Sequence, residues 1–347
     1  MSHPVHLVGS VPLADPDAVF RALSRTIGSL APRLPDGETG VRARWMGWLE
    51  PLFADNPDFV HDGGTVTSRS TGAVTRRYRP RPGVAPETVR FAGLRHAEIA
   101  IESYRAFADL KRQGVVAPAC RYQFALAHPY AVVHRYVEAE FQAAILPVYE
   151  RALLDQLRRI FAAVPHGQLA IQWDIASAIF TSLQLGDRTI FGSSKAELHP
   201  AFAAISTRIG EAIPADVDLL YHFCYGSSGN RHTVEPLDMG DMVEQANRIS
   251  AAIRRPVQLF HMPVPIERDD EAYFRPLAAL RLKPGAAPCL GLVHDQDGMD
   301  GTQRRMQAAR KFVKDFFIAT ECGFGRRNPE SLEALLRLHA EIGANAA

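Results

Sequence analysis

Histidine and cysteine side chains stand at the ends of three apolar runs in this 347-residue chain. His222 and Cys224 lie two positions apart where the run from Val217 ends. They therefore point to the same side of a β-strand, because side chains alternate along a strand. His261 and Cys322 each close a further apolar run. Imidazole and sulfur groups that converge from several strand ends suit zinc, so these four side chains predict a metal site.

The separation of these ligands over several strands helps to distinguish a catalytic metal site from a structural one. Structural zinc sites usually hold closely paired ligands on loops, whereas a catalytic site keeps one coordination position for water or substrate. Ligands on three strands favour the catalytic arrangement, in which substrate displaces one ligand or His261 is only a neighbour. Each residue alone has an ordinary alternative: a single Cys is commonly a small buried apolar residue, and a single His commonly forms hydrogen bonds in the core or at its rim.

The composition fits a soluble protein with a large core, since 47% of the residues are apolar and 22% are charged. A net charge of +1 gives no field that would attract nucleic acid or an anionic membrane. No apolar run approaches the roughly 20 residues of a membrane-spanning helix, and the first residues lack the pattern of a signal peptide. Four cysteines are too few for a disulfide framework. We therefore expect a cytoplasmic protein that binds neither nucleic acid nor membrane.

Short apolar runs alternate with longer amphipathic stretches along the chain. This alternation predicts parallel β-α-β units. Seven strands, with an eighth in a less regular region, favour a single-domain (β/α)₈ TIM barrel over residues 1–347. No G-x-G-x-x-G follows the first run, which argues against a dinucleotide-binding fold. The predicted strands are residues 6–11, 121–127, 168–174, 217–224, 257–262, 290–294 and 316–320, and the predicted helices include 137–161, 239–253, 302–314 and 332–342.

Residues 57–95 interrupt this alternation. Two short β-patterned segments, 65–67 and 73–75, flank residues 70–72, which end in glycine and are typical of a hairpin turn. We predict a hairpin-containing insertion over one end of the barrel. The candidate ligands all fall at the C-terminal ends of predicted strands, and this is the face of a TIM barrel where active sites form. The sequence therefore predicts an enzyme.

These residues resemble the cobalamin-independent methionine synthase family, in particular its C-terminal catalytic barrel. That family binds zinc through an H-x-C pair, a Glu and a Cys in a D-C-G segment. Here His222-Phe223-Cys224 matches the pair, Glu321-Cys322-Gly323 matches the last segment, and His261 stands at the Glu position. The resemblance implies a (β/α)₈ barrel that binds Zn²⁺ and transfers a methyl or alkyl group to a thiol. The shared superfamily also includes uroporphyrinogen decarboxylase-like proteins.

Further matches concern the substrate. The segment around Ser10 resembles the family's I-G-S-x-P strand, which holds an amino-acid carboxylate. Asp36-Gly37-Glu38 resembles the family's x-G-E segment, and the resemblance implies that Glu38 contacts the substrate amino group. Gln172-Trp173-Asp174 resembles the family's Q-x-D, which places Asp174 at the substrate. The Glu-Pro that normally follows is absent here, and this departure puts homocysteine itself in question. Trp173, like Trp45 and Trp48, either lines an apolar pocket or packs between barrel and helices.

The resemblance implies a mechanism in which zinc holds a small-molecule thiol as a thiolate near neutral pH, since coordination lowers the thiol pKa. The thiolate would attack a carbon of a methyl or alkyl donor, with a folate or a corrinoid protein as the source. The stretch 292–297 corresponds to a family segment that carries a catalytic His. His294, Asp295 or Asp297 would then protonate the leaving group.

Three other interpretations stay open. A metal-free, decarboxylase-like enzyme would use Arg and Asp groups, for which Asp36 and Arg42 are candidates. Iron in the His and Cys site would instead make a redox enzyme. A non-catalytic metal store or sensor would have four tight ligands and no substrate pocket, and it would have no use for the Gly9-Ser10 and Asp36-Gly37-Glu38 segments.

Overall fold

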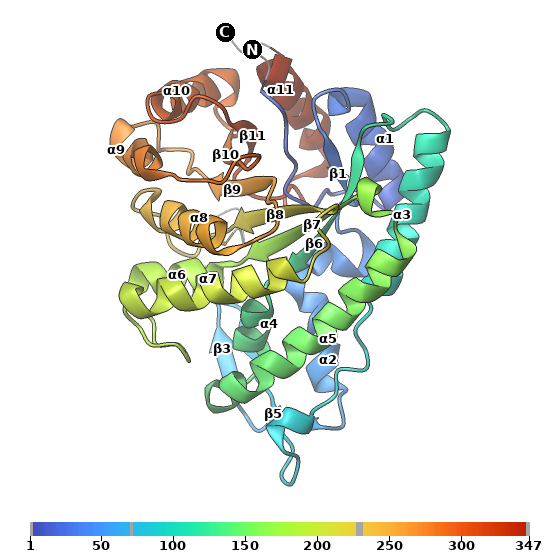
Figure 1. The fold of residues 1–347 in the computed structure, drawn as a ribbon, viewed down its shortest axis with the longest axis vertical. Coiled ribbons are helices and arrows are strands. Elements are labelled where there is room, and N and C mark those ends of the chain that lie inside the picture. The colour runs from blue at the N-terminus through green and yellow to red at the C-terminus, as the bar shows by residue number, and fades with distance from the viewer. Residues whose placement is uncertain (1–2, 70–71, 227–231, 345–347) are drawn as a thin grey trace.

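A curled, seven-stranded parallel sheet forms the centre of the molecule, with helices around its outer face (Figure 1). The structure is a computed structural model that describes residues 3–69, 72–226 and 232–344. The strands follow the order β1-β6-β7-β8-β9-β10-β11, so consecutive β-α units lie side by side. This arrangement confirms the predicted TIM-barrel fold. Its strands are β1 (Arg33–Pro35), β6 (Arg121–Ala127), β7 (Leu169–Ile175), β8 (Asp218–Phe223), β9 (Leu259–Pro263), β10 (Ala287–Val293) and β11 (Phe317–Thr320).

The helices between these strands bury one apolar face each against the sheet. Among the described residues, no helix is both long and apolar enough to cross a membrane. The α-helices are α1 (Pro16–Ile27), α2 (Pro51–Ala54), α3 (His96–Arg112), α4 (Pro129–Tyr136), α5 (Gln142–Ala163), α6 (Ser177–Leu185), α7 (Lys195–Glu211), α8 (Gly240–Ala252), α9 (Glu271–Phe274), α10 (Gly298–Arg310) and α11 (Leu332–Ala344). Short 3₁₀ turns are Gly40–Leu49, Pro86–Thr88, Ala139–Phe141, His166–Gln168, Arg275–Ala279 and Pro329–Ser331.

The N-terminal segment closes the barrel between β11 and β1. Val5 forms a parallel bridge with Ile318 of β11, and Ser10 forms one with Gly37, just after β1. The predicted first strand, residues 6–11, therefore lies where a barrel strand belongs, although it pairs only through single bridges. The eighth strand that the sequence left unplaced is β1. Its three residues contain one aliphatic side chain, Leu34, so the apolar pattern gives no signal for it.

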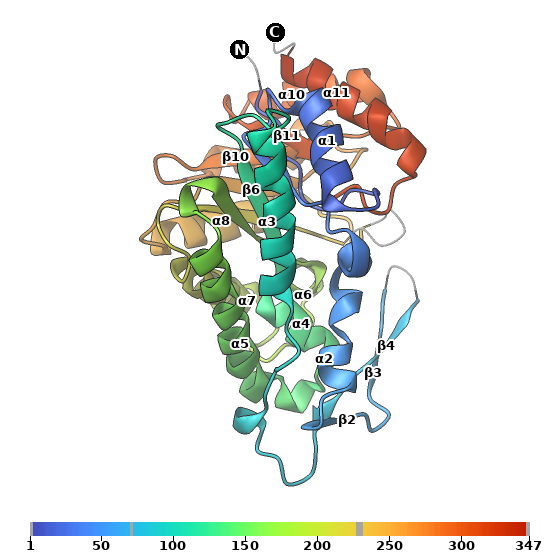
Figure 2. The same ribbon diagram turned by 90° about the vertical axis from the view of Figure 1, so that its right-hand side faces the viewer.

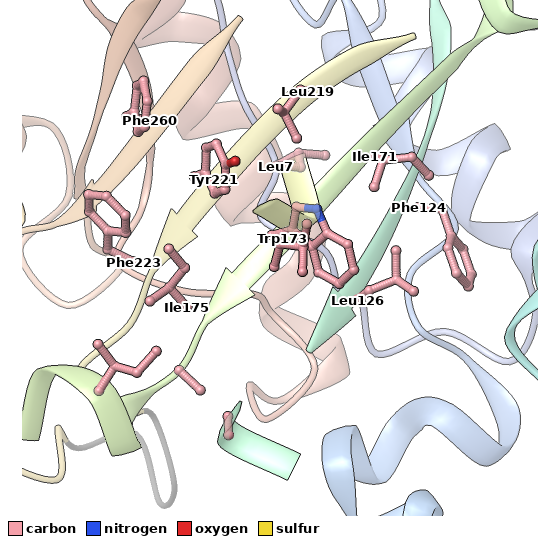
Figure 3. Close-up of a cluster of buried hydrophobic side chains, with 14 of the residues drawn as sticks. Leu7, Phe124, Leu126, Ile171, Trp173, Ile175, Leu219, Tyr221, Phe223 and Phe260 are labelled. Carbon is pink, nitrogen blue, oxygen red and sulfur yellow. The ribbon is translucent and has the colours of Figure 1, made fainter. Parts of the chain in front are cut away.

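Strand alternation sorts the side chains into a barrel interior and a helix-facing layer. On β7 and β8 the odd-numbered residues join the large apolar core, among them Trp173 and Tyr221 (Figure 3). The even-numbered residues point inward, where Ala170 and Leu220 form a small apolar layer with Leu259, Cys289 and Ala319. Above that layer the in-register pairs Asp174–His222 and His222–His261 bring polar groups to the C-terminal end.

The predicted insertion is present as two small antiparallel sheets beside α2 (Figure 2). The hairpin of β3 (Thr65–Thr67) and β4 (Val74–Arg76) contacts α4, while β2 (Phe59–Val60) pairs with β5 (Arg79–Pro80). Ser70 and Thr71 of the predicted turn lie outside the described residues. Gly72 has φ +69°, a conformation that glycine adopts without strain.

Candidate metal centre

Three of the four predicted ligands meet at the C-terminal end of the barrel. The ligand atoms of His222, Cys224 and Cys322 all lie within 4.8 Å of one another. The Cys224 and Cys322 sulfurs are 4.0 Å apart, and the Cys322 sulfur is 3.8 Å from Nε2 of His222. Two sulfurs each about 2.3 Å from a tetrahedral zinc are separated by about 3.8 Å. The three side chains therefore already have the spacing of a tetrahedral Cys₂His site.

His261 does not join this group, because both of its ring nitrogens have other partners. Its Nε2 lies 2.9 Å from the carbonyl oxygen of Thr320, so it donates there. Burial lowers the pKa of His261 to about 3, and the neutral ring therefore accepts at Nδ1. The partner at Nδ1 is Nδ1 of His222, at 2.8 Å. His222 is thereby held in the tautomer whose Nε2 lone pair faces the two sulfurs.

The electrostatics of the three ligands favour a cation among them. The hydrogen bond to Cys322 and burial raise the pKa of the Cys224 thiol well above its ordinary value, because a second nearby thiolate is unfavourable. Burial opposes a proton on His222, but Cys322 and Asp174 outweigh it and raise the pKa. The N–H of Gly226 donates to the Cys224 sulfur at 3.3 Å, which stabilises a thiolate. A divalent ion would neutralise the two sulfurs, so the donor set fits zinc.

A cavity of about 290 Å³ opens beside these ligands. Ser10, Glu38 and Asp174, which the sequence placed at a substrate, all line it, as do the three metal-ligand candidates. The cavity is bounded on another side by Trp45 and neighbouring residues of the 3₁₀ turn Gly40–Leu49. One open space therefore contains the metal-ligand candidates and most of the predicted substrate residues.

Glu38 and Asp174 are buried carboxyl groups in the cavity wall. Burial raises the pKa of Glu38 to about 8, with Arg42 opposing and Asp174 reinforcing the shift. Burial also raises the pKa of Asp174 to about 6 against the effect of His222. Two carboxyl groups that disfavour each other's charge would gain from a bound cation, such as an ammonium group.

The backbone of this wall is strained. Within residues 3–69, 72–226 and 232–344, Glu38 (φ 50°) and Trp45 (φ 51°) are the non-glycine residues with positive φ, and both line the cavity. A Cβ on Gly9 would lie 2.7 Å from Oε1 of Glu38, so a larger residue there would displace this carboxyl group. Strained residues of this kind concentrate at functional sites.

Ser10 connects the N-terminal segment to the loop after Cys322. Its hydroxyl accepts a hydrogen bond from the N–H of Gly325 at 3.1 Å, and its carbonyl accepts one from the N–H of Phe324 at 2.7 Å. A Cβ at Gly323 would lie 2.3 Å from the Ser10 hydroxyl. Ser10 therefore positions the loop that carries a metal-ligand candidate, in addition to lining the cavity.

Trp173 lies outside the cavity. It follows Gln172 on β7 and points to the helix-facing layer, where it is fully buried beside Ile171, Ile175 and Leu126 (Figure 3). The sequence could not decide which of these neighbours faces inward; the structure places Gln172 inside, with its amide donating to Asp174 at 2.8 Å.

His294, Asp295 and Asp297 are not among the described residues that line the cavity. His294 donates to the carbonyl of Val264 at 2.9 Å, and burial lowers its pKa to about 4. Asp297 forms a two-pronged ion pair with Arg305, at 2.7 and 2.8 Å. Asp295 pairs with Arg327. Their role in protonating a leaving group stays a prediction.

Asp36 and Arg42, the candidates for a metal-free enzyme, neutralise each other. The guanidinium of Arg42 donates to the Asp36 carboxylate at 2.6 Å and to the carbonyl of Ala125 at 2.9 Å, and it lies over the ring of Phe124. Both side chains are buried, and neither lines the metal cavity. This pair supports the strained Gly37-Glu38 turn, since Asp36 also accepts from the N–H of Glu38.

Fold and site together describe a TIM barrel with a candidate metal centre at the C-terminal face. No protein-family model and no curated protein matches the chain. Solved structures do match over nearly the whole length. A putative vitamin-B12 independent methionine synthase from Listeria monocytogenes is 15% identical with a TM-score of 0.54, over 99% of both chains. A B12-independent methionine synthase from Shewanella sp. W3-18-1, in complex with selenomethionine, is 13% identical with a TM-score of 0.56, over 99% of this chain and 97% of the other.

At these identities the likeness concerns the fold. It confirms the barrel that the sequence resemblance implied, and the chemistry has to be argued from the side chains described above.

Proposed function

We propose that this protein is a zinc-dependent transferase that moves a methyl or alkyl group to a thiol substrate. The observation that carries the proposal is the Cys₂His set with tetrahedral spacing, open to a cavity that also contains two buried carboxyl groups. Three protein ligands and an open position are the arrangement of a catalytic zinc site. The methionine synthases that share the fold support the same class of reaction.

His222, Cys224 and Cys322 would hold the ion, with His261 fixing the orientation of His222. Bound there, zinc would lower the pKa of a substrate thiol and so supply a nucleophile at neutral pH. Two thiolate ligands leave such a site with little net positive charge, which keeps the nucleophile electron-rich.

Glu38 and Asp174 would bind a cationic group of the thiol substrate. Their raised pKa values mean that the empty cavity holds at least one carboxyl proton near neutral pH. A substrate ammonium would favour both ionised forms, so its binding would release a proton. Trp45 would cover the reacting atoms and limit access of water.

Metal content tests the proposal directly. Elemental mass spectrometry on the wild type should give about one zinc per chain, and Cys224→Ser or Cys322→Ser should lose it. Cys289→Ser is the matched control, because Cys289 is buried in the apolar layer of the same barrel. Wild-type protein without metal after zinc reconstitution would refute the proposal, and stoichiometric iron would move the chemistry to redox.

Activity is the second test. Zinc-loaded protein incubated with a thiol and a methyl donor should consume the thiol, and both cysteine variants should not. A protein that binds zinc at these residues but alkylates no thiol across a panel of donors would be a metal-binding barrel rather than a transferase.

A further inference from the structure

A second cavity, of about 410 Å³, adjoins the metal cavity on the side of the hairpin insertion. We call it the arginine annex, after the four arginines that line it. Its walls come from the β3–β4 hairpin, from α4 and from α6, and the hairpin and α4 are in contact (Figure 2). The residues that line both cavities are Met46, Ser68, Arg135, Ser177 and Thr233. The arginines are Arg69, Arg77, Arg135 and Arg188.

The charge of the annex is not balanced by its own residues. Arg69 pairs with Asp187, which is the carboxylate in the annex wall. Within the described chain, no ion pair joins Arg77, Arg135 or Arg188 to a carboxylate. Three guanidinium groups therefore line one space without an ion-pair partner among the described residues, although the charge of Glu138 acts on Arg77 from outside the annex wall. The net charge of the whole protein is only +1. Such a concentration of positive charge attracts anions.

Buried polar atoms in the annex also lack partners. Thr181 is 5% exposed, and its hydroxyl has no hydrogen-bond partner among the described residues. The Nε atoms of Arg77 and Arg135 are likewise buried and without an acceptor there. Burying such donors without a partner lowers stability, and more so for charged groups. An acceptor-rich ligand would satisfy all three.

The start of α6 also favours an anion in the annex. Ser177 and Ala178, the first two residues of this nine-residue helix, line the annex, and its N-cap residue Ala176 offers no capping side chain. The first N–H groups of a helix and its dipole favour a negative charge placed beside them.

We propose that the arginine annex binds the anionic tail, a carboxylate or phosphate group, of the donor molecule whose reactive carbon lies in the metal cavity. This inference rests on the proposed transfer reaction, because only that reaction requires a donor whose reactive carbon reaches the metal centre while its tail is bound elsewhere. Arg135 lies at the junction of the two cavities and would bind the part of the tail nearest the reacting carbon. Guanidinium groups bind carboxylate and phosphate through paired hydrogen bonds.

Calorimetric titration of the zinc-loaded protein with inorganic phosphate and with succinate tests the annex without requiring catalysis. We expect at least one of them to bind with a Kd of about 1 mM and to weaken as salt is added. Arg135→Gln and Arg77→Gln should each weaken that binding about tenfold. Arg44→Gln is the matched control, because this exposed arginine lines the metal cavity only, and it should change affinity less than about twofold. Tighter phosphate binding would indicate a phosphate tail, and tighter succinate binding a carboxylate tail.

The inference is overturned if neither anion binds below about 20 mM, or if Arg44→Gln weakens binding as much as Arg135→Gln. Should Arg77→Gln fail to fold, since Arg77 also donates to the carbonyl of His134, the Arg135 and Arg188 variants decide the matter. Repeating the titration on metal-stripped protein separates the two proposals. If the protein cannot retain zinc but still binds anions, the annex is supported and the transferase is refuted. If the protein is a zinc-loaded, active transferase that binds no anion, the transferase is supported and the annex is refuted.

Discussion

The two ends of the barrel interior are built from different interactions. At the N-terminal end, which we call the floor, Arg33 donates to Asp218 at 2.7 Å and Arg121 lies 3.2 Å from the same carboxylate. An apolar layer covers this cluster from above. At the C-terminal end, the mouth, the structure holds two close sulfurs, the buried carboxyl groups of Glu38 and Asp174, and strained backbone. Charges are paired at the floor, and like groups are gathered at the mouth.

The difference agrees with the proposed binding site at the mouth. Stability is lowered when carboxyl groups are buried beside each other and when Glu38 is held at positive φ. Such arrangements are typical of functional sites. At the floor the carboxylate of Asp218 pairs with Arg33 and Arg121, so this carboxyl group has its counter-charge within the fold. We therefore expect that substitution of a polar side chain at the floor lowers the stability of the protein, whereas substitution of one at the mouth lowers ligand or metal binding.

The largest effect on stability is expected from Asp218→Asn. It leaves two guanidinium groups at the floor without their carboxylate. Breaking a buried ion pair costs about 3–5 kcal/mol, and this part-buried cluster belongs at the lower end of that range. Urea unfolding should show a loss of about 3 kcal/mol, while zinc per chain stays unchanged. The control Asp17→Asn breaks an exposed pair with Arg21 and should cost less than about 0.5 kcal/mol. Loss of zinc in Asp218→Asn would contradict the separation of floor and mouth.

Glu38→Gln should change how stability depends on pH. Because the folded pKa of Glu38, about 8, lies above its ordinary value of 4.5, the folded state holds an extra proton between these values. The stability that Glu38 contributes is therefore complete below pH 4.5 and is lost as the pH rises through 8. Metal-stripped wild type should lose on the order of 2 kcal/mol more than Glu38→Gln between pH 5 and 9. Parallel pH profiles for the two proteins would show that the carboxyl of Glu38 is not desolvated.

His261 variants separate a metal ligand from a residue that only orients one. His261→Phe removes the acceptor for Nδ1–H of His222, and loss of such a partner lowers metal affinity about 10- to 100-fold. One zinc should still bind at saturation. His261→Gln, whose amide can accept from His222 and donate to the Thr320 carbonyl, should recover part of the affinity. Loss of the metal in both variants at saturating zinc would make His261 a ligand.

Much of the barrel could be predicted because its buried strands consist of runs of apolar residues. The predicted strand 217–224 contains β8, and alternation correctly placed His222 and Cys224 on one side. Strand β1 gave no such signal, since it is three residues long and is held by its pairing with β6. Short strands of this kind depend on the rest of the sheet rather than on their own side chains.

The site was predictable in type but not in orientation. His261 lies beside His222 in the strand register, as expected for ligands at neighbouring strand ends. Its Nε2, however, donates to the carbonyl of Thr320. The sequence likewise does not indicate that the candidate acids Asp297 and Asp295 pair with Arg305 and Arg327. The arginine annex left no motif, because its walls come from three separate elements. Partners that are distant in sequence are visible only after the fold is known.

The smallest effect is expected from Ser10→Ala, at the edge of the mouth. The substitution removes the hydroxyl that accepts from the N–H of Gly325. A lost hydrogen bond of this kind costs about 1 kcal/mol, which urea unfolding can resolve. Since the bond holds the loop that begins at Cys322, zinc affinity should fall about two- to threefold with the stoichiometry preserved. Unchanged zinc affinity together with weaker substrate binding would assign Ser10 to the substrate alone, and the mouth would then hold its metal ligands independently of the N-terminal segment.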